Sequence, residues 1–123
     1  MYDHIGLHVK DLDHSIAFYE AVLAPLGYEL CSRDAASASF GPPGAPALYL
    51  YVSNKRAARG GTHIALRATG AGVVRKFHAA GLRAGGEDNG GPGVRADYAP
   101  SYYAAFVRDP DGNNVEAVCM EEQ

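Results

Sequence analysis

The stretch His4-Ile5-Gly6-Leu7 recurs 59 residues later as His63-Ile64-Ala65-Leu66, and this repeat decides the fold. Towards the end of each half the spacing lengthens to 67 residues, where Leu48-Tyr49-Leu50 matches Val115-Glu116-Ala117. A longer connection in the second half accounts for the change in spacing. Because self-similarity at a fixed spacing is the signature of a repeated unit, we interpret the chain as two copies of one structural unit.

Each half predicts a strand, a helix and further strands. In the first half, residues 3–9 alternate between apolar and other side chains, which indicates a strand with one face on a core. An apolar stripe from Leu12 to Leu26 then predicts a helix, ended by Pro25 and Gly27. Breaker residues separate three further predicted strands, at 28–32, 36–40 and 47–53.

The second half repeats this order with a longer connection. We predict a strand at 62–68, a helix at 71–83, and strands at 102–108 and 113–120 that are joined by a tight turn at 109–112. Residues 85–93 are too rich in glycine for a regular element, so we expect 85–101 to be an irregular connection. Its length fits either a mobile lid over a site or a plain surface loop.

These elements predict an α+β fold of two paired βαβββ modules forming an open, cupped, mixed β-sheet. We expect one domain, 1–123, with module 1 at about 1–54, a linker at 55–60 and module 2 at about 61–120. Each unit is too small to bury its apolar face alone, so the two should pair, either within one chain or between chains. We expect a homodimer, because partners commonly cover exposed sheet edges.

Composition restricts the class of protein. The chain of 123 residues has 47% hydrophobic and 20% charged residues, which excludes intrinsic disorder, and its net charge of −3 argues against nucleic acid as a partner. No apolar run is long enough for a membrane span, so no membrane partner is expected. The N-terminus lacks the profile of a signal peptide, so we expect a cytoplasmic protein in which Cys31 and Cys119 remain thiols.

The strand phase turns several polar side chains away from the helices and towards one face. His4 and His8 share that face on the first strand, His63 and Arg67 share it on the equivalent strand, and Glu116 shares it on the last strand. Two histidines and one carboxylate form a metal-binding set that leaves coordination positions open for a substrate. We therefore predict a metal site of His4, His63 and Glu116.

Other polar and aromatic residues are candidates for catalysis, binding or solvation. The candidate catalytic residues are His8, Tyr49 and Arg67. The candidate substrate-binding residues are Tyr51, Arg95, Tyr98 and Tyr102. Two further histidines, His14 and His78, fall on the predicted helices and are expected to be solvated.

The chain resembles the vicinal oxygen chelate superfamily, which holds glyoxalase I, extradiol dioxygenases, fosfomycin-modifying thiol transferases and bleomycin-binding proteins. The resemblance spans nearly the whole chain and rests on four motifs in order. They are Asp3-His4-Ile5-Gly6-Leu7 with Asp11-Leu12, Ser15-Ile16-Ala17-Phe18-Tyr19, residues 60–66, and Asp109-Pro110-Asp111-Gly112-Asn113-Asn114-Val115-Glu116. It implies paired βαβββ modules and one divalent metal ion (Fe, Mn, Ni, Zn or Co) held at His4, His63 and Glu116.

One position departs from the glyoxalase I pattern. Members with that activity carry a fourth, carboxylate ligand that also serves as a base, on the strand where this chain has Tyr49. A phenol, with a pKa near ~10, is a poor base at neutral pH, which argues against the ordinary glyoxalase I reaction. Dioxygenases and fosfomycin transferases of the superfamily use the three-ligand set, so the departure leaves metal binding intact.

The resemblance implies a metal-dependent, glyoxalase-like enzyme of the lyase or isomerase type. Its substrate would be a small molecule that chelates the metal through two neighbouring oxygens. The alternatives are an extradiol-type dioxygenase, a thiol transferase of the fosfomycin-resistance type, and a non-catalytic protein that binds a small molecule such as an antibiotic.

Overall fold

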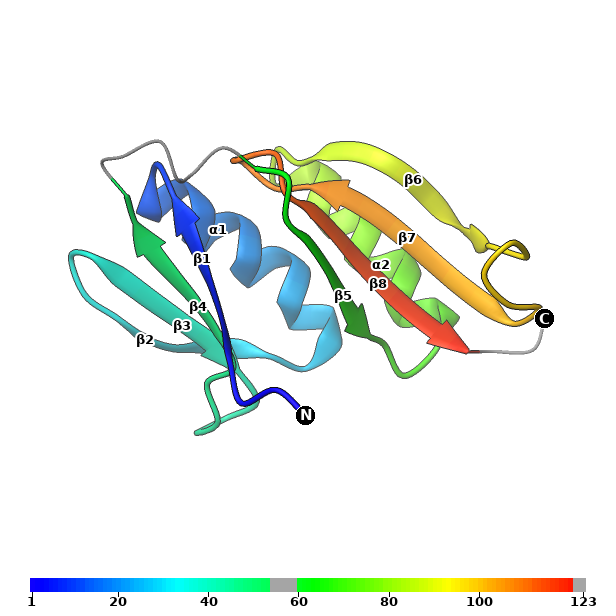
Figure 1. Cartoon of the computed structure of the whole chain (residues 1–123), viewed down its shortest axis with the longest axis horizontal. Coiled ribbons are helices and arrows are strands. Elements are labelled where there is room, and N and C mark those ends of the chain that lie inside the picture. Colours follow the sequence, from blue (N-terminus) through cyan, green and yellow to red (C-terminus); the bar gives the residue numbers. More distant parts are fainter. Residues whose placement is uncertain (54–59, 121–123) are drawn as a thin grey trace.

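The computed structural model describes residues 1–53 and 60–120 and contains the two predicted modules (Figure 1). The first module comprises β1 (Ile5–Val9), α1 (Leu12–Leu23), the short 3-10 helix η1 (Ala24–Leu26), β2 (Glu29–Arg33), β3 (Ser37–Gly41) and β4 (Leu48–Val52). The second comprises β5 (His63–Arg67), α2 (Ala71–Arg83), β6 (Glu87–Val94), β7 (Tyr102–Arg108) and β8 (Asn114–Met120). Residues 55–59 of the predicted linker lie outside the described residues.

The two modules have the same strand order and equivalent registers. One sheet runs β1-β4-β3-β2 and the other β5-β8-β7-β6. In each, the first strand pairs in parallel with the last, with Gly6 opposite Tyr49 in one sheet and Ala65 opposite Glu116 in the other. The remaining pairs are antiparallel. The predicted α+β fold of two βαβββ units is thereby confirmed, and Tyr49 and Glu116 occupy equivalent places.

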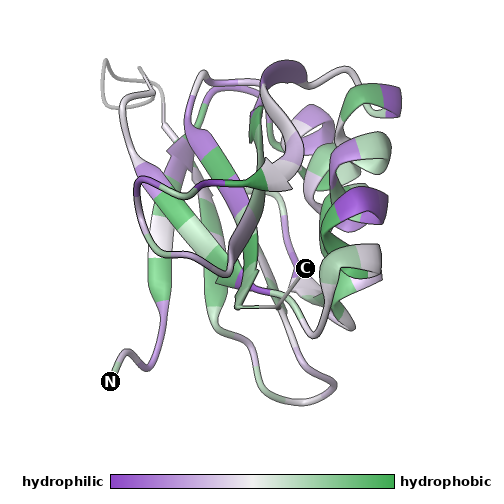
Figure 2. Cartoon of the chain, turned by 90° about the vertical axis from the view of Figure 1, so that its right-hand side faces the viewer, coloured by the Kyte–Doolittle hydropathy of each residue, from purple (hydrophilic) through white to green (hydrophobic). Residues whose placement is uncertain are grey.

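Both helices cover the same side of the sheets, as the turned view in Figure 2 shows. The helices contact each other, and α2 also packs on β6, β7 and β8. The core between the layers draws on both modules and includes the fully buried Phe18, Phe40, Phe77 and Val115. The opposite faces of β1 and β5 remain exposed, which leaves His8 and Arg67 open to solvent.

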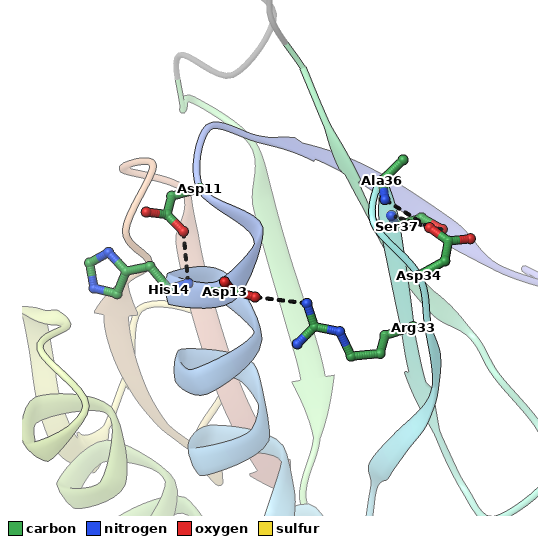
Figure 3. Close-up of polar contacts among 7 residues, drawn as sticks. All are labelled: Asp11, Asp13, His14, Arg33, Asp34, Ala36 and Ser37. Atoms are coloured by element: carbon green, nitrogen blue, oxygen red, sulfur yellow. Dashed lines mark hydrogen bonds and ion pairs between the residues drawn. The ribbon is translucent and has the colours of Figure 1, made fainter.

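Short-range polar contacts fix the ends of the first-module elements (Figure 3). The carboxylate of Asp11 accepts a hydrogen bond from the backbone N–H of His14 at 3.0 Å, which caps α1. Asp34 Oδ1 accepts from the backbone N–H groups of Ala36 and Ser37 at 2.8 Å each, which closes the turn between β2 and β3. Those hydrogen bonds lower the pKa of Asp34.

The structure of the glycine-rich stretch in the second half differs from the predicted irregular connection. Residues 87–94 form an eight-residue edge strand, β6, instead of an irregular connection or lid. Its pairing with β7 shifts register around Gly90, and Arg95 donates from its guanidinium to the carbonyls of Gly91 and Gly93 at 2.7 and 2.9 Å. An edge strand tolerates Pro92 and several glycines because only one side must form the ladder.

The turn between β7 and β8 is a polar cluster that reaches the first module. Asp109 is 5% exposed and accepts backbone hydrogen bonds from Asp111 and Asn113 at 2.9 Å each. Its other carboxylate oxygen accepts from the hydroxyl of Tyr19, on α1, at 2.5 Å. Burial, followed by the Asp109 charge, raises the pKa of Tyr19 well above its usual value. The turn therefore joins the modules through a buried hydrogen bond.

Asp111 adds a second link between the modules at the same turn. Its carboxylate accepts from the backbone N–H of Lys10 at 3.1 Å and from the hydroxyl of Ser15 at 3.4 Å. Gly60, at φ +81°, lies so close to this turn that a Cβ there would meet the Asp111 carbonyl oxygen at 2.6 Å. Desolvation raises the pKa of the Asp111 carboxyl.

None of the helices within 1–53 and 60–120 is long and apolar enough to cross a membrane.

Candidate metal-binding and ligand site

His63 and Glu116 meet on the exposed face of the second sheet. His63 begins β5, and Glu116 lies on the adjacent β8 with its side chain turned to the same face by the strand alternation. His63 Nε2 lies 3.0 Å from Glu116 Oε1. The Glu116 side chain is 2% exposed, whereas that of His63 is 50% exposed. A buried carboxylate beside an accessible imidazole forms a site open on one side.

Tyr102, from β7, completes the surroundings of the carboxylate. Its hydroxyl donates a short hydrogen bond to Glu116 Oε2, so both carboxylate oxygens have a partner. Desolvation and the contact with Glu116 raise the pKa of Tyr102 to about 12, which keeps the phenol protonated as the donor. Tyr98 packs edge-on against the Tyr102 ring with centroids 5.0 Å apart.

The orientation of the His63 ring is fixed from two directions. Nδ1 lies 3.1 Å from the backbone carbonyl oxygen of Asn114, which directs Nε2 towards Glu116. The ring stacks on Phe106 with centroids 6.3 Å apart, and the Arg95 guanidinium covers the same Phe106 ring at 5.3 Å. Phe106 and Asn114 were not predicted as site residues. Their positions on β7 and β8 could have drawn attention to them, since both share the face of Glu116.

In the first module, Tyr49 occupies the place that Glu116 has in the second, so a phenol ring stands there instead of a carboxylate. His4 Nδ1 lies 2.7 Å from Asp3 Oδ1, and the His4 ring meets Tyr49 edge-on with centroids 5.3 Å apart. Tyr49 and Tyr51 are parallel at 6.1 Å, and His8 lies 6.1 Å from Tyr51. The predicted residues His4, His8, Tyr49 and Tyr51 therefore form a row along one sheet.

The structure brings His63 and Glu116 together but does not bring His4 to them within one chain. Strands β1 and β5 belong to different sheets and run in opposite directions (Figure 1), so the start of β1, next to His4, and the start of β5, at His63, lie at opposite ends of the two strands. Within the described residues, no three His, Cys, Asp or Glu side chains form a group that could hold a metal ion. The three-ligand site stays a prediction.

The chemistry of the His63–Glu116 pair nevertheless fits two ligands of a divalent metal. Imidazole nitrogen and carboxylate oxygen are common ligands of such ions. Two ligand atoms that each lie about 2.1 Å from an ion at a right angle are about 3 Å apart, close to the 3.0 Å separation here. The contact of Nδ1 with a backbone carbonyl is the usual outer support of a metal-binding histidine.

The remaining candidates have different surroundings. Arg67 is exposed at the end of β5, on the face of His63, and Arg95 is engaged by β6 carbonyls and Phe106. Tyr98 is 64% exposed. His78 differs from expectation: its side chain is 12% exposed and Nε2 lies 2.9 Å from Asp88 Oδ1, because the β6 strand covers this side of α2.

Comparisons with known proteins agree with this architecture. The sequence model of the Glyoxalase/Bleomycin resistance protein/Dioxygenase superfamily matches residues 2–117. A glyoxalase/bleomycin resistance protein from Albidiferax ferrireducens is 30% identical with a TM-score of 0.85, over 96% of this chain and 98% of that one. No curated protein matches the chain.

Two more distant structures share the fold. A glyoxalase-related enzyme from Fulvimarina pelagi is 20% identical with a TM-score of 0.73, over 93% of this chain and 84% of that one. The fosfomycin resistance protein FosX from Mesorhizobium loti is 18% identical with a TM-score of 0.67, over 94% and 87% of the two chains. At these identities the likeness concerns the fold alone.

Proposed function

The chain belongs to the Glyoxalase/Bleomycin resistance protein/Dioxygenase superfamily, and from that premise we propose that it is a metal-dependent, glyoxalase-like enzyme of the lyase or isomerase type. Its substrate is a small molecule with two neighbouring oxygen atoms. The observation that carries the proposal is the 3.0 Å contact between His63 Nε2 and the buried carboxylate of Glu116. A buried carboxylate beside an oriented, accessible imidazole is an arrangement that is concentrated at functional sites.

The proposed third ligand is His4 of a second copy of the chain, so the working unit is a homodimer. In one chain β1 and β5 run in opposite directions, so His4, before β1, and His63, at the start of β5, lie far apart, yet both side chains are exposed. Placing the first module of one copy against the second module of another brings these side chains together. It also covers the exposed side chains of β1 and β5, among them His8 and Arg67.

When bound, a divalent ion supplies Lewis-acid stabilisation of negative charge that develops on the substrate oxygens. The residues of this chain hold and shield that site. Tyr102 keeps the Glu116 carboxylate in place, and the Asn114 carbonyl and Phe106 keep Nε2 of His63 directed at it. His8 is the proposed proton-transfer residue, because it is an exposed histidine on the same face of β1 as His4 and imidazole is the side chain most often used for proton transfer.

The remaining predicted residues take positions around the substrate in this proposal. Arg67 carries a positive charge on the same face as His63 and suits an anionic group. Tyr51 and Tyr98 offer exposed rings for an apolar part of the molecule, being 37% and 64% exposed. Arg95 acts through Phe106, whose ring it covers at 5.3 Å.

Elemental analysis tests the metal site directly. The native chain and His4→Ala, His63→Ala and Glu116→Gln variants are loaded with one divalent metal at a time, and the bound metal per chain is measured. We expect each variant to lose the metal. His14→Ala is the matched control, because His14 is an exposed histidine on α1 outside the proposed ligand set. Unchanged metal content in the three variants would remove the site.

Subunit mixing tests whether two copies share it. In a hybrid of the His4→Ala and His63→Ala chains, one site regains all three ligands and the other lacks both histidines. After full exchange, about a quarter of all sites are therefore intact. Recovery of metal binding in the mixture, and in neither variant alone, supports the shared site. Hybrids that are verified by mass yet bind no metal contradict it.

A second candidate function is non-catalytic binding of a small molecule. It is favoured by the fact that both Glu116 oxygens already have protein partners, His63 and Tyr102, so the carboxylate is satisfied without an ion. Tight ligand binding that a chelator leaves unchanged would support this candidate. A substrate screen of metal-loaded protein, with dioxygen and a thiol supplied in separate arms, separates the glyoxalase-like reaction from ring-opening dioxygenation and thiol transfer.

A further inference from the structure

A separate cavity of about 290 Å³ opens at the end of the molecule where β1 begins. Its walls come from both modules: Ile5 and Leu48 of the first sheet, Leu23 at the end of α1, Phe40 of β3, and Ile64 and Leu66 of β5. The cavity residues on β1 and β5 lie on the side of the sheets that faces the helices. Ile5 shares the face of the buried Leu7, and Leu66 shares the face of the buried Ile64. His63 and Glu116 occupy the other face of the second sheet.

The cavity walls are almost entirely hydrocarbon. Phe40 is 0% exposed, Leu23 is 1% exposed, and Ile64 and Leu48 are 7% and 8% exposed, so this part of the wall belongs to the buried core. The lining also includes Tyr2 and Tyr28, and the exposed Asp3 and His4, which pair with each other at 2.7 Å, lie at the opening. Water gains few hydrogen bonds in a space lined in this way, so such cavities favour apolar guests.

We propose that this cavity binds a small, uncharged, largely apolar molecule about the size of a bicyclic aromatic ring system. The volume is close to the lower end of small-molecule sites, roughly 300 Å³, which excludes a large ligand. Among the described lining residues there is no lysine or arginine to pair with an anionic group, and the Asp3 carboxylate at the opening disfavours one. The cavity shares His4, at its opening, with the proposed metal site, but the binding proposed here requires no metal.

Indole is a suitable probe because the chain contains no tryptophan. Its fluorescence can therefore be excited selectively, and transfer into an apolar cavity shifts its emission to shorter wavelength. We expect saturable binding of indole to the metal-free chain. Indole-3-acetate should bind at least about tenfold more weakly, because its carboxylate meets Asp3 at the opening.

Two substitutions that fill the cavity from different sides test its location. Ala47→Phe adds a ring from the segment before β4, and Leu66→Phe adds one from β5; both residues line the cavity. Each should weaken indole binding by at least about tenfold. Ala35→Phe is the matched control, because Ala35 is exposed in the turn between β2 and β3, away from the cavity walls, and should bind like the native chain.

Methyl NMR then reports where the probe lies. Indole should shift the methyl resonances of Ile5, Ile64 and Leu66 before any others. Binding that survives both filling substitutions, or that first shifts methyls elsewhere, would overturn the proposal. A further contrary result is a fall in molecular mass of Ala47→Phe from dimer to monomer, which would assign this surface to contact with a second copy instead of a small molecule.

Discussion

The hydroxyl of Tyr102 donates a hydrogen bond to the carboxylate of Glu116, from one strand of the second sheet to its neighbour. The side chain of Glu116 is nearly inaccessible to water, so its oxygens depend on protein groups for their hydrogen bonds. Tyr102 is therefore part of what positions Glu116 for His63, and the contact can be removed by deleting a single oxygen atom.

The Tyr102→Phe substitution is expected to weaken binding of a divalent metal by about tenfold or more, since loss of an outer hydrogen-bond partner typically has this effect. The measurement is a competition titration against a metal-binding dye. Tyr98→Phe serves as the control, because Tyr98 contacts the Tyr102 ring and not Glu116. Equal metal affinity in the two variants would assign Tyr102 a packing role only.

The Tyr19→Phe substitution should lower the free energy of unfolding by about 1–3 kcal/mol, because it leaves a buried oxygen of Asp109 without one of its donors. Urea unfolding followed by circular dichroism measures the change. Tyr2→Phe, at a 78% exposed position, should leave the stability unaltered. A native-like midpoint for Tyr19→Phe would show that the contact between the modules contributes nothing.

The raised pKa of Asp111 predicts that the contribution of this carboxyl to the free energy of unfolding decreases as the pH rises, which is the reverse of the usual case for an aspartate. Desolvation raises the pKa of its carboxyl above 3.8, so the folded chain holds this proton more tightly than the unfolded chain. The stability that this difference contributes is fully present at a pH below the pKa of the carboxyl in the unfolded chain. It is lost as the pH rises through the pKa of the carboxyl in the folded chain. Relative to the native chain, Asp111→Asn should therefore become more stable as the pH rises through that range, in urea unfolding at a series of pH values.

The lowered pKa of Asp34 predicts the opposite dependence of stability on pH. Backbone hydrogen bonds from Ala36 and Ser37 lower its pKa below 3.8, so its contribution is present above the unfolded pKa and is lost as the pH falls through the folded pKa. The deficit of Asp34→Asn relative to the native chain should shrink on acidification. If the two asparagine variants show the same slope against pH, one of these two assignments is wrong.

Much of the fold follows from local patterns in the sequence. Alternation around His4 and His63 predicted which side chains share a face, and the lengthened spacing of the repeat placed Tyr49 and Glu116 at equivalent register positions. These predictions depend on the period of a strand and on pairing between sheet neighbours, both of which are local properties of the chain.

The way in which the two modules pack against each other depends on tertiary contacts, which the alternation of residues along a strand does not predict. Alternation could assign His4 and His63 to exposed faces, but it could not show that β1 and β5 run in opposite directions as neighbours. Glycine content likewise suggested an irregular connection at 85–101, whereas pairing with β7 imposes a strand on residues 87–94. Tertiary contacts override weak local propensity at an edge.

The hydrogen bond between Tyr19 and Asp109 also shows how far the two halves have diverged. With the repeat spacing of 59 residues, the position equivalent to Tyr19 in the second module is His78. His78 pairs with Asp88 of its own module, so it does not form an equivalent contact with the first module. The acceptor of the buried Tyr19 hydroxyl therefore comes from the second module, so the interior of the first module is completed by a residue that its own sequence does not contain.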